Sequence, residues 1–173
     1  MPKPMYFHPF QDQRHYTGMF TLPSWVSLHG ISPRTTGAHY KYLWKMGAAS
    51  TTFANYTQNG HRIYVMGHCV PGGRYLTTET GTYEQCYYHE LVDMLRDHGL
   101  PVNSSAHIRI HACHSASPSL AGANDSFAEL LKSELNNRNY NNVTVRGYTV
   151  GVGIYLGWRW GGWEPANNHH VDF

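Results

Sequence analysis

The stretch HIRIHACHS, residues 107–115, constrains the fold of this chain more than any other part of the sequence. Apolar and polar residues alternate in it at the period of two that an extended strand produces, so one strand face would carry Ile108, Ile110 and Ala112. Residues 114–124, rich in Ser, Ala, Pro and Gly, then predict a loop. We therefore expect Cys113 where a strand ends. Reacting groups in open α/β sheets gather at that end, which makes Cys113 a candidate nucleophile, with a buried, inert cysteine as the alternative.

A strand, a helix and the strand at 107 follow one another in this part of the chain. The run RIYVMG, residues 62–67, is rich in β-branched and aromatic residues and predicts a strand that ends at His68. Helical spacing of apolar residues predicts a helix over about residues 83–98, opened by a capping box of Thr82 and Gln85. This order is that of a parallel crossover.

A second unit of the same kind follows. Ser126 and Glu129 form a capping box before an apolar stripe, an Asn-rich turn covers residues 136–142, and residues 143–155 predict a strand interrupted by glycines. Alternation also predicts a strand over residues 38–46. The fold class expected is α/β, with a mainly parallel sheet flanked by helices.

The length of 173 residues suits a single domain. Proline-rich residues 1–36 predict an extended arm packed on the domain, and residues 37–173 form the domain itself. Three of the five tryptophans fall among glycines in residues 157–165, a pattern that fits a flap or an aromatic corner.

Composition limits the partners and the compartment. The formal net charge is +2 and the 13 Lys and Arg residues are scattered, which argues against nucleic acid as a partner. The first 18 residues hold no apolar signal-peptide core and no run is long enough for a membrane span, so we expect a soluble protein. Three cysteines argue against a disulfide framework. The expected location is cytoplasmic, or a host or target cell reached without a cleavable signal peptide; the oligomeric state stays open.

His68 and Cys113 terminate the two strands on either side of one crossover helix. Consecutive parallel strands tend to be neighbours, so the two side chains are expected at the same edge of the sheet. An imidazole there would take the thiol proton, and the thiolate would attack a carbonyl carbon. Cys69 is the rival thiol, but alternation should turn its side chain away from that of His68.

At these residues the chain resembles a known family. IYVMGHCVPGG followed by IRIHACHSA, with SFAELLKSEL and VTVRGYTV behind them, resembles the caspase-like cysteine peptidases, nearest to the autoprocessing peptidase domain of large bacterial toxins. The resemblance covers about residues 60–155. It implies a three-layer sandwich and cleavage of a peptide bond, in the chain itself or in another protein, by a bacterial effector or toxin module.

The resemblance also implies roles for single residues. His68 would be the base and Cys113 the nucleophile, and the backbone N–H groups of Cys69 and Cys113 would line an oxyanion hole. An upstream acid orients the histidine in toxin domains, and the single acid before His68 here is Asp12. Contacts to the substrate are expected from Arg146, His114 and Ser115. No cofactor is expected, and because the arginines are spread singly we expect no inositol hexakisphosphate activator.

Two alternatives remain open on the sequence. Cysteine and histidine are zinc ligands, and a site could draw on His68, Cys69, His111, Cys113 and His114, although their spacing matches no common zinc signature. A catalytically inactive module that binds an extended peptide is the other.

Overall fold

The computed structural model describes residues 5–7, 9, 53–54, 61–77, 84–119, 125–150 and 169–173. Its strands are β1 (Met5–Phe7), β2 (Arg62–Met66), β3 (Tyr75–Thr77), β4 (Gln85–Tyr87), β5 (His107–His111), β6 (Thr144–Tyr148) and β7 (His170–Asp172). Within these residues the helices are α4 (Tyr88–Asp97) and α5 (Phe127–Asn137). The predicted α/β class is confirmed in this coarse form.

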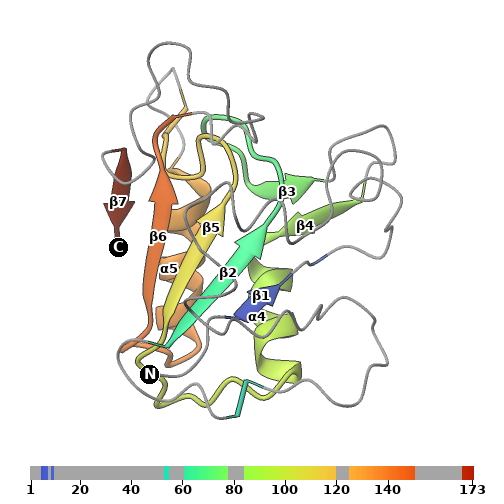
Figure 1. Ribbon diagram of the computed structural model, residues 1–173, viewed down its shortest axis with the longest axis vertical. Coiled ribbons are helices and arrows are strands. Elements are labelled where there is room, and N and C mark those ends of the chain that lie inside the picture. Colours follow the sequence, from blue (N-terminus) through green and yellow to red (C-terminus); the bar gives the residue numbers. More distant parts are fainter. Residues whose placement is uncertain are drawn as a thin grey trace, which may run out of the picture.

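One five-stranded sheet forms the centre of the molecule, in the order β1-β2-β5-β6-β7 (Figure 1). The first four strands run parallel, and β7 returns antiparallel to β6. Strands β2 and β5 pair over five positions, from Arg62 opposite His107 to Met66 opposite His111. The predicted adjacency of these two strands is therefore confirmed.

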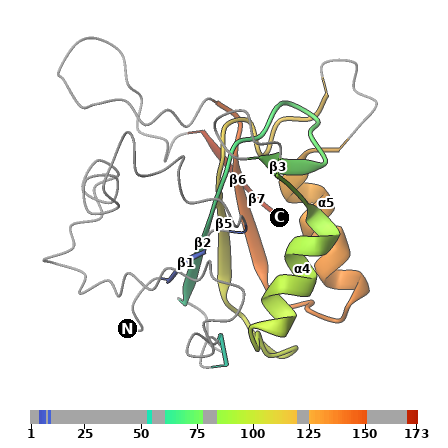
Figure 2. The same ribbon diagram turned by 90° about the vertical axis from the view of Figure 1, so that its right-hand side faces the viewer.

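Both helices cover the same face of the sheet (Figure 2). They also contact each other, since the Arg138 guanidinium after α5 donates to the Asp93 carboxylate of α4. That contact holds the pKa of Asp93 below its usual range. The part of the chain that the structure describes thus has one helical layer, on one face of the sheet.

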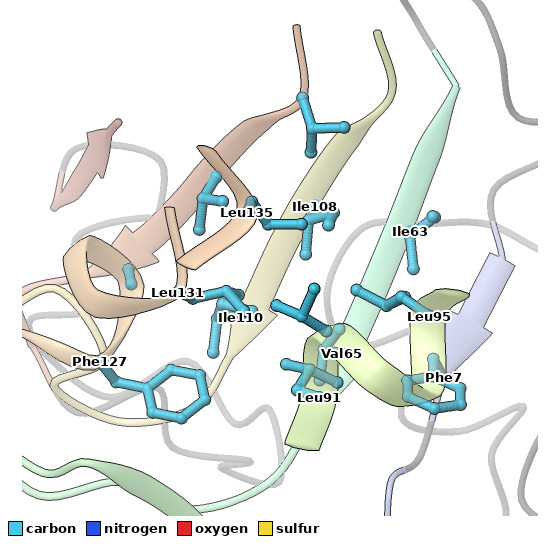
Figure 3. Close-up of a cluster of buried hydrophobic side chains, with 14 of the residues drawn as sticks. Phe7, Ile63, Val65, Leu91, Leu95, Ile108, Ile110, Phe127, Leu131 and Leu135 are labelled. Atoms are coloured by element: carbon cyan, nitrogen blue, oxygen red, sulfur yellow. The ribbon is translucent and has the colours of Figure 1, made fainter. Parts of the chain in front are cut away.

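The core lies between the sheet and this helical layer (Figure 3). Every second residue of β2 and β5 enters it, and the apolar stripes of both helices meet these side chains. Ten of the buried residues are labelled in the figure: Phe7, Ile63, Val65, Leu91, Leu95, Ile108, Ile110, Phe127, Leu131 and Leu135. Their burial is the main favourable contribution to folding, at about 25 cal/mol per Å² of apolar surface.

The start of α4 differs from the prediction. The helix begins at Tyr88, because residues 85–87 form β4 and pair antiparallel with β3. A capping box is present, but Glu90 provides it by accepting from the Tyr87 backbone N–H at 2.8 Å. The predicted box partner Thr82 lies outside the described residues. The predicted helix end is confirmed, with Gly99 at φ +83° just after it.

The second unit follows the prediction more closely. The Ser126 hydroxyl caps α5 by accepting from the Glu129 backbone N–H at 3.3 Å. Strand β6 covers the first part of the predicted strand, and Gly147 marks a close approach of the kind expected from a glycine in a strand. A Cβ built on Gly147 would lie 2.8 Å from the Ala128 Cβ and 2.9 Å from the Ala116 Cβ.

The ends of the chain add strands that the sequence did not indicate. Residues 5–7 of the predicted arm form β1 and pair parallel with β2 at the sheet edge, so this part of the arm belongs to the sheet. The predicted strand over 38–46, Gly151, Gly153 and the tryptophan-rich residues 157–165 lie outside the described residues. Among the described residues, no helix is both long and apolar enough to cross a membrane.

Replacing Gly147 by Ala should destabilise the fold, because the added methyl group overlaps two Cβ atoms in a closely packed contact. We expect the free energy of unfolding, measured by urea titration, to fall by about 1–3 kcal/mol. Ser133→Ala, an exposed position of α5, is the matched control and should change it by less than about 0.5 kcal/mol. Equal stability of both variants would contradict the packing described for Gly147.

Candidate active site

His68 and Cys113 follow the last paired residues of β2 and β5. The pairing ends with Met66 opposite His111, and the Gly67 N–H continues the ladder toward the His111 carbonyl at 3.4 Å. The two residues therefore lie at the same edge of the sheet on neighbouring strands, and both side chains are partly exposed. This placement agrees with the expectation that His68 and Cys113 lie at the same edge of the sheet.

A short hairpin that the sequence analysis missed holds His68 in place. The His68 N–H donates to the Thr77 carbonyl and the Thr77 N–H donates to the His68 carbonyl, both at 2.9 Å. Thr77 is the last residue of β3, which lies with β4 beside the end of β2 (Figure 1). Residues 75–77 do alternate in burial, with Leu76 buried between two partly exposed residues. Three residues are too few, however, to predict a strand from the sequence.

The three thiols of the chain differ in their surroundings. Cys69 and Cys86 are buried, and burial raises the pKa of each to about 12. Cys113 is the one cysteine that is partly exposed. A thiolate is the reactive form of cysteine, so Cys69 and Cys86 are poor nucleophiles at neutral pH, in agreement with the lower rank given to Cys69.

The backbone N–H groups beside the two strand ends differ in whether they donate to a carbonyl of the described residues. The N–H groups of Gly67, His68, His114 and Ser115 all donate to carbonyls. Within the described part of the chain, the N–H groups of Cys69 and Cys113 donate to none. These are the two groups expected to line an oxyanion hole.

His114 is fixed to the end of β6. Its backbone has φ +53°, its N–H donates to the Val150 carbonyl at 3.1 Å, and its ring Nδ1 lies 3.2 Å from the Thr149 carbonyl. The Ser117 hydroxyl donates to the same carbonyl at 3.0 Å and lies 3.4 Å from Nδ1. Predicted as a substrate contact, His114 is partly exposed beside Cys113.

Ser115 has a different environment. Its side chain is fully buried, and its hydroxyl donates to the Ile110 carbonyl at 3.1 Å while accepting from the Tyr148 N–H at 3.0 Å. Both hydrogen-bonding functions of the hydroxyl are thus used inside the protein. The structure gives Ser115 a structural role, tying the loop after Cys113 to β5 and β6, in place of the expected contact with substrate.

Arg146 is also engaged within the protein. It lies opposite Arg109 in the β5–β6 pairing, away from the strand ends, and forms a bidentate ion pair with Asp172 of β7 at 2.5 and 2.6 Å. This pair keeps the pKa of Asp172 low. The structure therefore does not bring Arg146 to Cys113, and Asp12, the expected orienting acid for His68, lies outside the described residues.

His111 lies in a buried polar and aromatic cluster on the sheet face opposite the helices. Its ring packs edge-on against Tyr64 and Tyr148, with centroids 5.0 and 5.3 Å apart. The Tyr148 hydroxyl lies 3.3 Å from His111 Nε2, and burial raises the pKa of Tyr148. These contacts secure β5 two residues before Cys113.

The zinc alternative finds no geometric counterpart here. Across the described ranges, no three His, Cys, Asp or Glu side chains are grouped so that they would hold a metal ion. The reason is visible at the strand ends, because Cys69 belongs to the core cluster on the helical face whereas His111 packs on the opposite face.

Comparison with known proteins adds no identification. No protein-family model matches the chain, and no curated protein matches it.

Alkylation of the folded protein should separate the three thiols. At neutral pH, iodoacetamide should modify Cys113 while Cys69 and Cys86, buried and with raised pKa values, react only after unfolding. Peptide mapping by mass spectrometry with and without urea measures this. Cys113→Ala is the control and should leave the folded protein unmodified. Native modification of Cys69 or Cys86 at the rate of Cys113 would contradict the burial described.

Proposed function

We propose that this protein is a cysteine endopeptidase that uses Cys113 as nucleophile and His68 as base. The observation that carries the proposal is that the partly exposed thiol of the chain and a histidine follow paired ends of adjacent parallel strands. The other two thiols are buried with pKa values of about 12, so they do not compete.

The proposed reaction proceeds in two stages. His68 takes the Cys113 proton, and the thiolate attacks the scissile carbonyl carbon to give a tetrahedral intermediate. The N–H groups of Cys69 and Cys113 donate to its oxyanion. His68 then gives the proton to the leaving amine, the C–N bond breaks, and a thioester remains. Water, deprotonated by His68, hydrolyses the thioester and restores the thiol.

The sequence resemblance supports the finer part of the proposal. A caspase-like sandwich has a mainly parallel sheet with the two catalytic groups at neighbouring strand ends, and the parallel pairing of β2 with β5 supports the proposal. On this basis we propose a peptide substrate, in the chain itself or in another protein, and a role as an effector or toxin module.

Cleavage of a peptide library tests the proposal. Wild-type protein should cleave, Cys113→Ala should not, and His68→Gln should lower kcat/KM by about 10²–10⁴-fold, the usual contribution of a general base. Intact-mass analysis of the same three proteins detects cleavage of the chain itself.

His89→Gln is the matched control for the histidine variant, because His89 is an exposed residue of α4. It should retain wild-type kcat/KM. Equal cleavage by wild type and Cys113→Ala would refute the proposal. Peptide binding without cleavage by the wild type would instead favour the inactive binding module.

A further inference from the structure

A histidine directly after the proposed nucleophile has an unusual backbone conformation. His114 has φ +53°, in a region that costs a side chain with a Cβ about 1–2 kcal/mol. Such conformations persist where the surrounding structure enforces them, and they cluster at functional sites. Here the Val150 carbonyl accepts the His114 N–H and the Ala112 carbonyl accepts the Ser115 N–H, at 3.1 and 3.4 Å.

The partners of the ring determine which nitrogen carries the proton. A carbonyl oxygen is only an acceptor, so the nitrogen 3.2 Å from the Thr149 carbonyl must be an N–H. The Ser117 hydroxyl gives its own proton to that carbonyl, so toward His114 its oxygen is an acceptor too. The neutral ring therefore carries its hydrogen on Nδ1, which leaves a lone pair on Nε2.

That lone pair has no partner among the residues that the structure describes. The hydrogen bonds that the ring makes to described residues, those with Thr149 and Ser117, both involve Nδ1. Thr149 is itself held, because its N–H and hydroxyl donate to the His169 carbonyl at 2.8 and 3.2 Å. A fixed acceptor is thus presented on the partly exposed loop that carries Cys113.

We propose that His114 Nε2 accepts a hydrogen bond from a backbone N–H of the peptide substrate and holds the scissile carbonyl over the Cys113 sulfur. This inference rests on the proposed peptidase function and adds a substrate-binding residue to it. An extended peptide offers donors of this kind at every residue, so the contact selects backbone geometry rather than a side chain.

His114→Asn tests the role of Nε2 separately from the role of Nδ1. The Asn side-chain amide can donate to the Thr149 carbonyl as Nδ1 does, and Asn tolerates positive φ, but it has no group at the Nε2 position. We expect kcat/KM to fall about 3- to 10-fold, mainly through KM, as for loss of one hydrogen bond. The thermal midpoint and the alkylation rate of Cys113 should stay at wild-type values.

Ser117→Ala is the matched control, since it removes a neighbour of Nδ1 and leaves Nε2 in place. Its kcat/KM should remain within about twofold of the wild type. A peptide that the wild type cleaves is also prepared with each backbone amide near the scissile bond methylated in turn. Methylation of one amide should lower kcat/KM for the wild type but leave kcat/KM of His114→Asn unchanged. This non-additivity indicates a direct contact between that amide and His114.

The outcomes separate the two proposals. Unchanged kcat/KM in His114→Asn, with an active wild type, would overturn the role of Nε2 and leave the peptidase proposal intact. The role of Nε2 is also overturned if methylation of each amide lowers kcat/KM equally in the wild type and in His114→Asn. It is overturned as well if no amide methylation lowers kcat/KM in the wild type. A wild type that cleaves no peptide overturns the peptidase function and this inference together.

Discussion

The parallel pairing of β2 with β5 is the interaction on which the rest of this structure depends. The pairing aligns five residues of each strand and ends with Met66 opposite His111, so the two strands end at the same level in the sheet. This register places His68 and Cys113 just beyond the paired ends of neighbouring strands. Backbone hydrogen bonds between the two strands therefore determine that His68 and Cys113 lie at the same edge of the sheet.

The loop after Cys113 depends in turn on its attachment to β6. Ser115 joins Ile110 to Tyr148 through one hydroxyl, and the Ala116 N–H donates to the Tyr148 carbonyl at 2.9 Å. Ala116 can approach so closely because residue 147 is glycine. The Ser115 carbonyl accepts the Ala128 N–H of α5 at 2.8 Å, so the loop is held between strand and helix. Buried contacts of Ser115 and Ala116 thus hold the loop directly after Cys113 and His114, which are both partly exposed.

The sequence allowed the parts of the fold with strong periodicity to be predicted. Period-two alternation located β2 and β5, and the Ser126 cap located α5, because each signal lies within the segment it describes. The hairpin of β3 and β4 was missed, since three-residue strands carry no periodic signal and their pairing joins residues about ten positions apart. The same pairing explains why α4 begins at Tyr88 and not at residue 83, because residues 85–87 form strand β4. At the site, alternation favoured Cys113 over Cys69 as the nucleophile. The hydrogen bond of Ser115 with Tyr148 and the ion pair of Arg146 with Asp172 could not be predicted, because the partners are distant in sequence.

Alternation also separates the chemistry of the two sheet faces. Ile63, Val65 and Cys69 share one parity along the chain and enter the core under the helices, whereas His68 has the other parity. A slip of one residue in the β2–β5 register would exchange them, placing the histidine in an apolar core and the thiol at the opposite face. The cost of burying an imidazole without partners opposes that slip, as does the loss of the Ile63 and Val65 packing. The hydrophobic residues that stabilise the sheet therefore also determine that Cys69 enters the core while the adjacent His68 stays partly exposed.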